Sequence, residues 1–343
     1  MRIDLSETAP DDWDEFLENH GGAPTYVRSD AVRIGASAFG LRTFFLAARD
    51  ESSALVGILP LVEQSSVIFG RYLISVPFFT YGGIVAHDRG AVRSLVHRAS
   101  ELGSERRVAH VELRHSGEAP EVQLQERLDK VSMVLKLPED EDALDKSFGS
   151  KLRSQIRRAD REDPEIEWGG SDRLSEFYSV FSQTMHALGT PVYPKSFFDV
   201  VYEALDGFVS VLVIRVNGQV EAAAIVVRHG NELEVPWAAA SLYAKRSAIN
   251  MRMYRELLLF AMRSGATAFD FGRCSVDSGT YRFKAQWGAK PRQLHWHYWL
   301  ARESQLPQLN QDNPKYAMAA AIWRRMPLWV ANTLGPRISR HLP

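Results

Sequence analysis

The sequence predicts a mixed α/β protein made of two similar domains in tandem. Its 343 residues are too many for one ordinary hydrophobic core and suit two domains of roughly 150 residues each. The same order of elements occurs twice along the chain: two helices, a hairpin, a further strand, a long helix and a buried strand. Matching elements lie roughly 160 residues apart, far more than a solenoid repeat, which indicates a domain duplication.

The first copy is expected to begin with a helix that carries Trp13, Phe16 and Leu17 on one apolar face. A second helix follows Pro24-Thr25-Tyr26. The remaining expected elements are a hairpin whose first strand covers 43–49, a strand near 71–79, a helix at about 90–102 and a buried strand at 109–113.

The second copy repeats this order. Its first helix carries Leu174, Phe177 and Phe181, and its second helix begins near Lys195. The pair Asn217-Gly218 lies between two apolar runs and predicts a tight hairpin, because both residues tolerate positive φ. The remaining expected elements are strands at 208–216 and 232–239, a helix at about 248–263 and a buried strand at 268–271.

The join between the copies is expected near 137–150, where a charged stretch begins a helix. The predicted domains are therefore 1–145 and 146–303, and the second carries the candidate motifs. A helical tail follows at 304–343.

Composition limits the classes of function. A formal net charge of −1 argues against a dedicated nucleic-acid binder, and we expect no DNA partner. Cys274 is the only cysteine, which excludes a disulfide framework and a cysteine zinc cluster within one chain. The N-terminus lacks a signal-type apolar core, and no apolar run reaches the roughly 18–20 residues of a membrane span. We therefore expect a cytoplasmic protein.

The segment 148–159 contains two arginines that a helix would place side by side. Arg153 and Arg157 are four residues apart, so their guanidinium groups are neighbours on one face. Neighbouring like charges repel unless an anion lies between them, and the pair therefore suits a phosphate or a carboxylate. The alternative is a solvated basic face balanced by the acidic residues of 160–163.

A proline interrupts the strand predicted at 232–239. Pro236 cannot donate to a sheet ladder, so it marks an edge, a bulge or a point where two strands separate. Separated strands leave backbone N–H groups free to polarise the carbonyl of a thioester or ester. Glu234 could then act as a general base for an attacking amine. Alternatively, Pro236 only ends a strand and Glu234 faces solvent.

The segment 269–288 holds the highest density of candidate residues. A short apolar strand ends at a glycine-containing turn, and a short helix then carries aromatic and basic side chains. Ligands gather beyond the carboxyl ends of such strands. Tyr281 and Phe283 offer apolar contact, while a desolvated Lys284 could lose its proton or pair with a phosphate. The alternative is an amphipathic helix whose aromatic residues belong to the core.

The cysteine and two of the histidines predict no further chemical site. Cys274 has no Cys-His-Asn pattern around it and is interpreted as unreactive. His295 and His297 alternate along a predicted final strand and face the same side, but two ligands without a nearby third make a weak metal site. We interpret them as part of a half-buried strand and expect no metal ion.

The segment 316–343 combines aromatic residues with arginines. Trp323 and Trp329 lie close in sequence to Arg324 and Arg325. This composition suits a membrane interface, particularly one that carries a lipid-linked substrate. Packing of the segment on the first domain explains the same pattern, and both interpretations stay open.

Three of these segments carry a family resemblance. The segments 150–159, 234–237 (EVPW) and 269–288 (FDFGRCSVDSGTYRFKAQWG) resemble the FemAB-related proteins of PEP-CTERM/exosortase systems, and more widely the Fem and GNAT acyltransferase families. The resemblance covers nearly the whole chain. It implies two GNAT-like domains that face each other across a cleft and transfer an acyl or aminoacyl group to an amine. In the Fem family the donor is aminoacyl-tRNA and the acceptor a peptidoglycan precursor.

The resemblance also implies roles for individual residues. The basic segment matches a helix that would hold acceptor phosphates, and Phe283 and Lys284 match the Phe-Lys pair of the Fem C-terminal motif near the transfer site. The predicted catalytic residues are Glu234 and Lys284, and the predicted substrate-binding residues are Lys151, Arg153, Arg157, Trp237, Tyr243, Arg273, Tyr281 and Phe283.

Two features of the related families are missing. The long helical arm of some Fem proteins has no counterpart. The glycine-rich pyrophosphate loop of coenzyme A-dependent GNAT enzymes is absent from 244–250, where glycines would let backbone N–H groups approach the pyrophosphate. Lys245 and Arg246 could still pair with phosphate. We expect no bound cofactor, and an acyl donor that is either aminoacyl-tRNA or acyl-CoA.

Three functions follow from these observations. The first is transfer of an acyl or aminoacyl group to an amine of a cell-envelope or exopolysaccharide precursor at the inner face of the membrane. The second is acyl-CoA-dependent N-acylation of exopolysaccharide amino sugars, and the third a catalytically inactive GNAT pair that serves as a binding module. The expected partners are a small-molecule or lipid-linked precursor, tRNA as a donor, and the membrane surface through the C-terminal tail.

Overall fold

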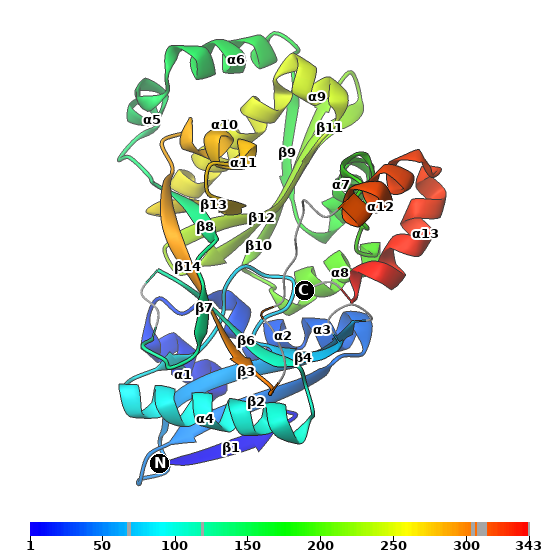
Figure 1. The fold of residues 1–343 in the computed structure, drawn as a ribbon. Helices are drawn as coiled ribbons and strands as arrows, with labels where there is room; N and C mark the ends of the chain where they lie inside the picture. The colour runs from blue at the N-terminus through cyan, green and yellow to red at the C-terminus, as the bar shows by residue number, and fades with distance from the viewer. Residues whose placement is uncertain (67–69, 118–119, 303–305, 307–313, 342–343) are drawn as a thin grey trace. The chain divides into compact units, whose positions relative to one another are not determined.

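The computed structural model describes residues 1–343 except 67–69, 118–119, 303–305, 307–313 and 342–343. Within it the chain divides into two units (Figure 1). The first comprises 1–132, 292–308 and 341–343, and the second comprises 133–291 and 309–340. Each unit combines helices with a mixed sheet, so the predicted α/β class is confirmed.

The sheet of the first unit has the strand order β1-β2-β3-β4-β6-β14, with β5 on β3 and β7 on β14. Strands β4 and β6 run parallel, and their neighbours pair antiparallel. The strands are β1 (Arg2–Ser6), β2 (Arg42–Arg49), β3 (Leu55–Ser66), β4 (Gly70–Ile74), β5 (Val85–Ala86), β6 (His110–Ser116), β7 (Gln125–Arg127) and β14 (Lys290–Leu300).

Helices cover both faces of this sheet. On β2, Phe45 meets Trp13 of α1 edge-on, whereas Phe44 and Leu46 join a core cluster with Leu95 of α4. Successive side chains of a strand point to opposite faces, so burial on both sides explains why β2 reads as a continuous apolar run. The helices are α1 (Trp13–His20), η1 (Thr25–Val27), α2 (Ser29–Val32), α3 (Ile34–Phe39) and α4 (Arg89–Glu105).

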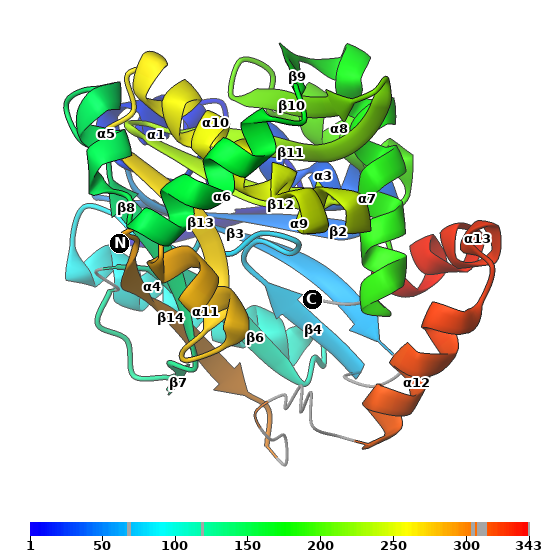
Figure 2. The same ribbon diagram turned by 90° about the horizontal axis from the view of Figure 1, so that it is seen from above.

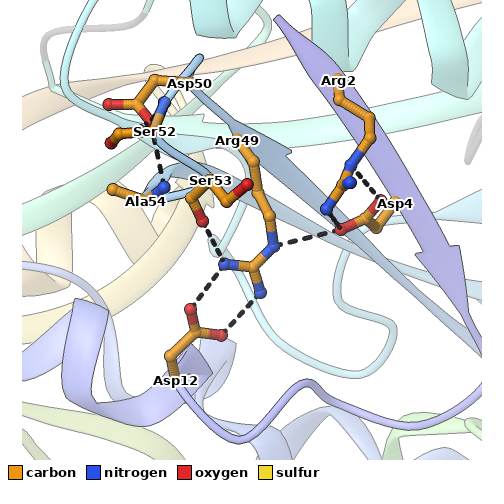
Figure 3. A network of polar contacts seen from close by, with 8 residues as sticks. All are labelled: Arg2, Asp4, Asp12, Arg49, Asp50, Ser52, Ser53 and Ala54. Carbon is orange, nitrogen blue, oxygen red and sulfur yellow. Dashed lines mark hydrogen bonds and ion pairs between the residues drawn. The ribbon is translucent and has the colours of Figure 1, made fainter.

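A polar network ties the end of β2 to the N-terminal segment (Figure 3). Arg49 forms two hydrogen bonds with Asp12, at 2.7 and 2.9 Å, and one with Asp4 at 3.1 Å. Its guanidinium also donates to the Ser53 carbonyl in the turn that follows β2. In the same turn, Asp50 accepts hydrogen bonds from the backbone N–H groups of Ser52 and Ala54, which fixes the connection to β3.

The pairing of the parallel strands β4 and β6 ends before the strand end predicted from the sequence. Its last pair in register is Ile74 with Glu112, and β4 stops there, although the sequence predicts a strand as far as residue 79. Pro77 cannot donate to a ladder, and Phe78 has a φ of +71°, which is a turn conformation. A cavity of only about 10 Å³ lies against 75–79, roughly the room for one water molecule.

The side chain of Arg114 closes this break. It is 2% exposed, and its Nε donates to Glu112 Oε1 at 2.7 Å. Its Nη1 donates to the carbonyl oxygens of Phe79 at 2.6 Å and Val76 at 3.4 Å, and the guanidinium stacks over the Trp296 ring. A buried guanidinium with this many acceptors is stable. The Arg114 side chain therefore fills the space where the pairing of β4 and β6 ends.

The sheet of the second unit has the order β8-β13-β12-β11-β10-β9, with β12 and β13 parallel. Its strands are β8 (Lys130–Lys136), β9 (Glu165–Gly169), β10 (Val209–Val216), β11 (Gln219–His229), β12 (Glu232–Ala240) and β13 (Ala268–Ser275). Its helices are α5 (Glu141–Ser147), α6 (Ser150–Asp160), η2 (Ser171–Arg173), α7 (Leu174–Leu188), α8 (Lys195–Ala204), α9 (Leu242–Ser247), α10 (Ile249–Arg263), α11 (Gly279–Ala285), α12 (Pro314–Arg325) and α13 (Leu328–Ser339).

The predicted hairpin at Asn217-Gly218 is confirmed. Both residues have positive φ, and Val216 pairs with Gln219 across the two-residue turn. The sheet it begins is covered on both faces. Trp168 of β9 stacks on Phe260 of α10, whereas Trp237 points to the opposite face and packs on α8.

The two units divide the chain differently from the boundaries drawn from the sequence. The second unit begins at Met133, ahead of the predicted boundary at 145. Most of β14 returns to the first unit, because its residues 294–300 pair with β6. The predicted boundary between 303 and 304 lies outside the described residues.

The C-terminal helices pack on the second unit. Both α12 and α13 contact α7, and His186 of α7 lies 2.8 Å from the Met326 carbonyl oxygen. The end of the tail belongs to the first unit, where His341 Nδ1 lies 2.6 Å from the Ser65 carbonyl oxygen of β3. No helix among the described residues is both long and apolar enough to span a bilayer.

The Arg49 network predicts a pH-dependent contribution to stability. Hydrogen bonding to Arg49 lowers the pKa of Asp12, so the contribution is present above the unfolded pKa, near 3.9, and is lost as pH falls through the folded pKa. Because the pair is partly exposed, Asp12→Asn should lower the free energy of unfolding by only about 0.5–1 kcal/mol at neutral pH. Urea unfolding of wild type and variant between pH 7 and the acid limit measures this.

The neighbouring exposed Asp11 supplies the control, and Asp11→Asn should leave the free energy of unfolding nearly unchanged. A gap between wild type and Asp12→Asn that persists unchanged at the lowest pH would contradict the assignment.

Candidate active site

The pairing of the two parallel strands ends inside the second unit. The ladder between β12 and β13 covers 232–234 and 268–270, although β12 continues to Ala240 and β13 to Ser275. On the other edge of β12, Val235 and Pro236 together face one residue of β11, which is a bulge. The predicted irregularity at Pro236 is thus confirmed, and it coincides with the end of the parallel ladder.

Lys284 enters this break from α11. Its Nζ donates to the Gly272 carbonyl at 2.7 Å and to the Arg273 carbonyl at 3.1 Å, and its side chain is 5% exposed. Gly272 has a φ of +78°, and a Cβ there would lie 3.4 Å from the Val235 carbonyl oxygen and 3.9 Å from Nζ. The ammonium group therefore binds backbone carbonyls of β13 just beyond the point where the pairing with β12 stops.

Two buried carboxylates face each other at the last pair of the ladder. Glu234 and Asp270 are in register, and both are fully buried. Glu234 Oε2 lies 3.1 Å from His229 Nε2, and Asp270 Oδ1 accepts a hydrogen bond from the Gly272 N–H at 2.7 Å. Two buried carboxyl groups therefore lie in the interior near Lys284.

Burial lowers the pKa of Lys284, while the nearby acidic groups of Asp270 and Glu234 oppose that shift. A lysine in this environment has two chemical uses. Protonated, it stabilises negative charge that develops on a carbonyl oxygen, because the low dielectric strengthens the interaction. Neutral, it accepts a proton from an attacking group.

The helix that carries Lys284 is fixed at its start and packed along one side. Ser278 caps α11 by accepting a hydrogen bond from the Tyr281 N–H at 3.1 Å. Phe283 is half-buried and meets the Tyr254 ring edge-on at 5.0 Å. Tyr281 is also half-buried, and the Arg273 side chain is exposed. Glu234, Arg273 and Lys284 thus lie at or just beyond the end of the ladder, and Tyr281 and Phe283 belong to the helix that carries Lys284.

The predicted basic helix forms as α6, which lies across α10 (Figure 2). Lys151, Arg153 and Arg157 are all exposed on it. Two of the three acidic residues expected to balance them are engaged elsewhere: Asp160 pairs with Arg252, and Glu162 accepts a hydrogen bond from a tyrosine of α9. Within the described part of the chain, the three cations have no ion pair or side-chain hydrogen bond, so they remain available to an anion.

The segment without the glycine-rich loop folds as a helix instead. Leu242–Ser247 form α9, which Ser241 caps, and α10 begins two residues after α9 ends. Ala248 joins the helices with a φ of +67°, a conformation that glycine would adopt more easily. Lys245 and Arg246 are exposed on α9, and Arg158 of α6 donates to the Arg246 carbonyl.

Trp237 and Tyr243 are not part of the group around Lys284. Trp237 is buried and meets the rings of Phe197 and Phe198 edge-on, at 5.8 and 5.3 Å, so it belongs to the core on α8. Tyr243 is exposed on α9 and donates to Glu162, a hydrogen bond that raises the pKa of its hydroxyl group. Neither side chain is placed beside the break.

Asp270 and Gly272, which lie near Lys284, and His229, which contacts Glu234, were not singled out in the sequence. Asp270 stands between two phenylalanines in a strand too apolar for a charge without a partner, and this was a usable signal. Gly272, two residues later, could have been recognised as a position of close backbone approach. Nothing in the sequence singles out His229, which reaches Glu234 across the β11–β12 turn.

The histidines of β14 face the same side, as predicted. His295 Nδ1 lies 2.6 Å from Glu126 Oε1, and His297 Nε2 lies 3.4 Å from the same oxygen. Burial and the neighbouring histidines lower the pKa of His115, which faces His297, to about 3. Among the described residues, no group of three or more suitable side chains is arranged to hold a metal ion.

Comparison with known proteins agrees with this architecture. Residues 146–285 match the family of acetyltransferase (GNAT) domains. FemX is similar in structure, with a TM-score of 0.66 and 14% identity over 88% of this chain and 98% of that chain. The C-terminal domain of a putative lysylphosphatidylglycerol synthetase from Agrobacterium fabrum has a TM-score of 0.53 and 15% identity, covering 91% and 96%.

A tandem GNAT protein of the clavulanic acid biosynthesis pathway is also similar, with a TM-score of 0.54 and 11% identity over 87% of this chain and 98% of that chain. A search of curated proteins found no match. Residues 146–285 are therefore similar to GNAT-type acetyltransferase domains, and the whole chain has the fold of tandem GNAT-like proteins.

The burial of Lys284 predicts a dependence of stability on pH. Because its pKa is lowered on folding, the charged lysine destabilises the fold most below the folded pKa. The penalty is relieved as pH rises through that value toward the unfolded pKa of about 10.4. The free energy of unfolding of Lys284→Met minus that of wild type should therefore fall with rising pH across this interval, as measured by urea unfolding.

Lys290, exposed at the start of β14, is the matched control, and Lys290→Met should give a flat difference from wild type. A flat difference for Lys284→Met as well would show that Nζ is not held in a desolvated site.

Proposed function

We propose that the chain transfers an acyl or aminoacyl group from an activated donor to an amine of a cell-envelope or exopolysaccharide precursor. The observation that carries the proposal is Lys284, a buried ammonium group at the end of the β12–β13 ladder in a GNAT-type domain. An ester or thioester carbonyl placed there would have its oxygen beside a fixed positive charge. Such preorganised charge is a main source of rate enhancement in acyl transfer.

The reaction would proceed by direct attack. The amine nitrogen of the acceptor bonds to the carbonyl carbon, and the oxygen becomes negatively charged beside the Lys284 ammonium. Collapse of this intermediate breaks the C–O bond of an ester donor or the C–S bond of a thioester donor. The amine gives up a proton to Glu234, whose Oε2 is within hydrogen-bond distance of His229, and the leaving oxygen or sulfur takes up a proton.

The α6 cations support an acceptor that carries phosphate. Lys151, Arg153 and Arg157 are exposed and unpaired within the described residues, and neighbouring guanidinium groups favour a phosphate between them. Precursors of envelope polymers that are carried on a nucleotide or a lipid contain such groups. The half-buried Tyr281 and Phe283 and the exposed Arg273 would contact the substrate near the bond that is formed.

The donor is proposed to be aminoacyl-tRNA. The segment 242–248 folds as α9 and a left-handed alanine rather than as a glycine-rich loop, which removes the usual cradle for the coenzyme A pyrophosphate. The name of one structural relative, lysylphosphatidylglycerol synthetase, denotes a product that carries an amino acid on a lipid. Both observations favour an aminoacyl group over a simple acyl group.

An acyl-CoA-dependent N-acyltransferase of exopolysaccharide amino sugars is the second candidate. It is favoured by the match of 146–285 to acetyltransferase domains and by the likeness to a tandem GNAT protein. Here Lys245 and Arg246 would pair with the coenzyme phosphates. A GNAT pair that binds ligands without turnover is the third candidate.

A donor comparison with the purified full chain tests these functions. Thermal unfolding is followed with charged tRNA, uncharged tRNA, acetyl-CoA and longer acyl-CoAs, and transfer to an amine acceptor is measured with the same donors. A donor at 100 times its dissociation constant should stabilise the chain by about 2.7 kcal/mol. We expect stabilisation and turnover with charged tRNA, and loss of turnover by about 10²–10³-fold in Lys284→Met.

Turnover with one acyl-CoA and none with charged tRNA would replace the leading proposal by the second candidate. Binding without turnover of any donor would support the third. Full activity of Lys284→Met would remove the lysine from the mechanism.

The α6 cations give a separate prediction. The double variant Arg153→Ala/Arg157→Ala should raise KM for a phosphate-bearing acceptor by about tenfold or more, with little change in kcat, because charge-assisted hydrogen bonds of roughly 1.5–3 kcal/mol are lost. Arg93→Ala, an exposed arginine on α4, is the control. Unchanged kinetics in the double variant would show that α6 does not hold the acceptor.

A further inference from the structure

The C-terminal helices α12 and α13 present an apolar and basic outer surface. Met318, Ile322, Trp329 and Ile338 are among the large apolar side chains most exposed on the chain, and Trp329 is 73% exposed. Large exposed apolar groups that gather on neighbouring elements mark interaction sites rather than ordinary surface. We call the exposed side chains of α12 and α13 the C-terminal surface.

This exposure does not come from loose packing, because the opposite side of each helix is held firmly. In α12, Trp323 is buried, and Ala320 lies close to Gly189 at the end of α7. In α13, Ala331 is buried, and Gly335 lies so close to the Val192 backbone that a Cβ would be 3.0 Å from its N and O atoms. Figures 1 and 2 show both helices alongside α7.

Helical periodicity gathers several of the exposed residues of each helix on one side, although Ile338, nine residues after Trp329, does not share the side of Trp329. Met318, Ile322 and Arg325 are spaced as one stripe along α12, opposite to Trp323. Along α13, Trp329 and Arg337 share the outward side, away from the buried positions. Each helix is thus amphipathic in an unusual sense: its outer face combines large apolar groups with guanidinium groups.

The charged side chains of the segment 314–341 are all positive. Residues 314–341 contain no aspartate or glutamate, in a chain whose formal net charge is −1. The basic residues of the segment are Lys315, Arg324, Arg325, Arg337 and Arg340. Cations beside exposed tryptophan and aliphatic side chains match the interface of a bilayer that carries anionic lipids.

We propose that the C-terminal surface docks the protein on the surface of an anionic lipid bilayer. Trp329, Met318 and Ile322 enter the boundary between headgroups and acyl chains, while Arg325 and Arg337 pair with lipid phosphates. A second copy of this chain fits less well, because two surfaces that carry only positive charge repel each other. The proposal rests on α12 and α13 alone and does not depend on the proposed acyl transfer.

The test is co-sedimentation of the full chain with vesicles of phosphatidylcholine alone and of phosphatidylcholine mixed with phosphatidylglycerol. We expect binding to the mixed vesicles that weakens as salt is raised. Trp329→Ser and Met318→Ser/Ile322→Ser should each weaken binding by about tenfold or more. Arg325→Gln and Arg337→Gln should each weaken it by about fivefold.

Leu128, an exposed leucine of the first unit, supplies the matched control, and Leu128→Ser should bind like wild type. Because the substituted side chains are exposed, thermal unfolding should show that each variant remains folded. Absence of wild-type binding to mixed vesicles would overturn the proposal, as would equal binding by the Trp329→Ser and Met318→Ser/Ile322→Ser variants. A wild-type dimer that the same substitutions dissociate, without vesicle binding, would identify a protein interface instead.

Discussion

The second unit is organised around one buried charge that must find partners where a sheet has stopped supplying hydrogen bonds. The β12–β13 ladder ends at Glu234 and Asp270, and the carbonyls beyond it accept from Lys284. A buried ammonium without such acceptors would be too costly to keep. The same arrangement leaves that ammonium near the carboxyl groups of Glu234 and Asp270. Lys284 therefore both satisfies the backbone carbonyls beyond the ladder and supplies the charge that the proposed reaction uses.

Much of the fold could be predicted because local signals agree with the tertiary structure. Asn217-Gly218 specifies a turn by its backbone preferences alone, and Pro236 marks an irregular strand because it lacks an N–H group. Pairing over long sequence distance left no such signal. The edge strands β1 and β9 were not identified, and β14 joins β6 although 173 residues lie between the strands.

The sequence predicted the kind of chemistry at the candidate site better than it predicted which residues form the site. Glu234 was found because a charged residue stands close to a proline in an apolar strand, and Lys284 because it lies on a short helix after a glycine-containing turn and matches the Phe-Lys pair of the Fem resemblance. Trp237 was predicted as a substrate contact, but alternation along β12 turns it toward α8, and the sequence does not say which face a ligand would approach. His229 depends on a turn that brings two strand ends together.

The two copies differ at the point where the pairing of their parallel strands ends. Counted from the start of each strand, Arg114 of β6 stands where β13 has Gly272. The arginine fills the first break from within its own strand, whereas the glycine leaves the second open to a lysine from α11. Loss of Arg114 would leave Glu112 buried without its ion pair, at a cost of about 3–5 kcal/mol. Substitution of Arg114 alone would therefore not open the first break without this cost, so the two halves of the chain are unequal at this position.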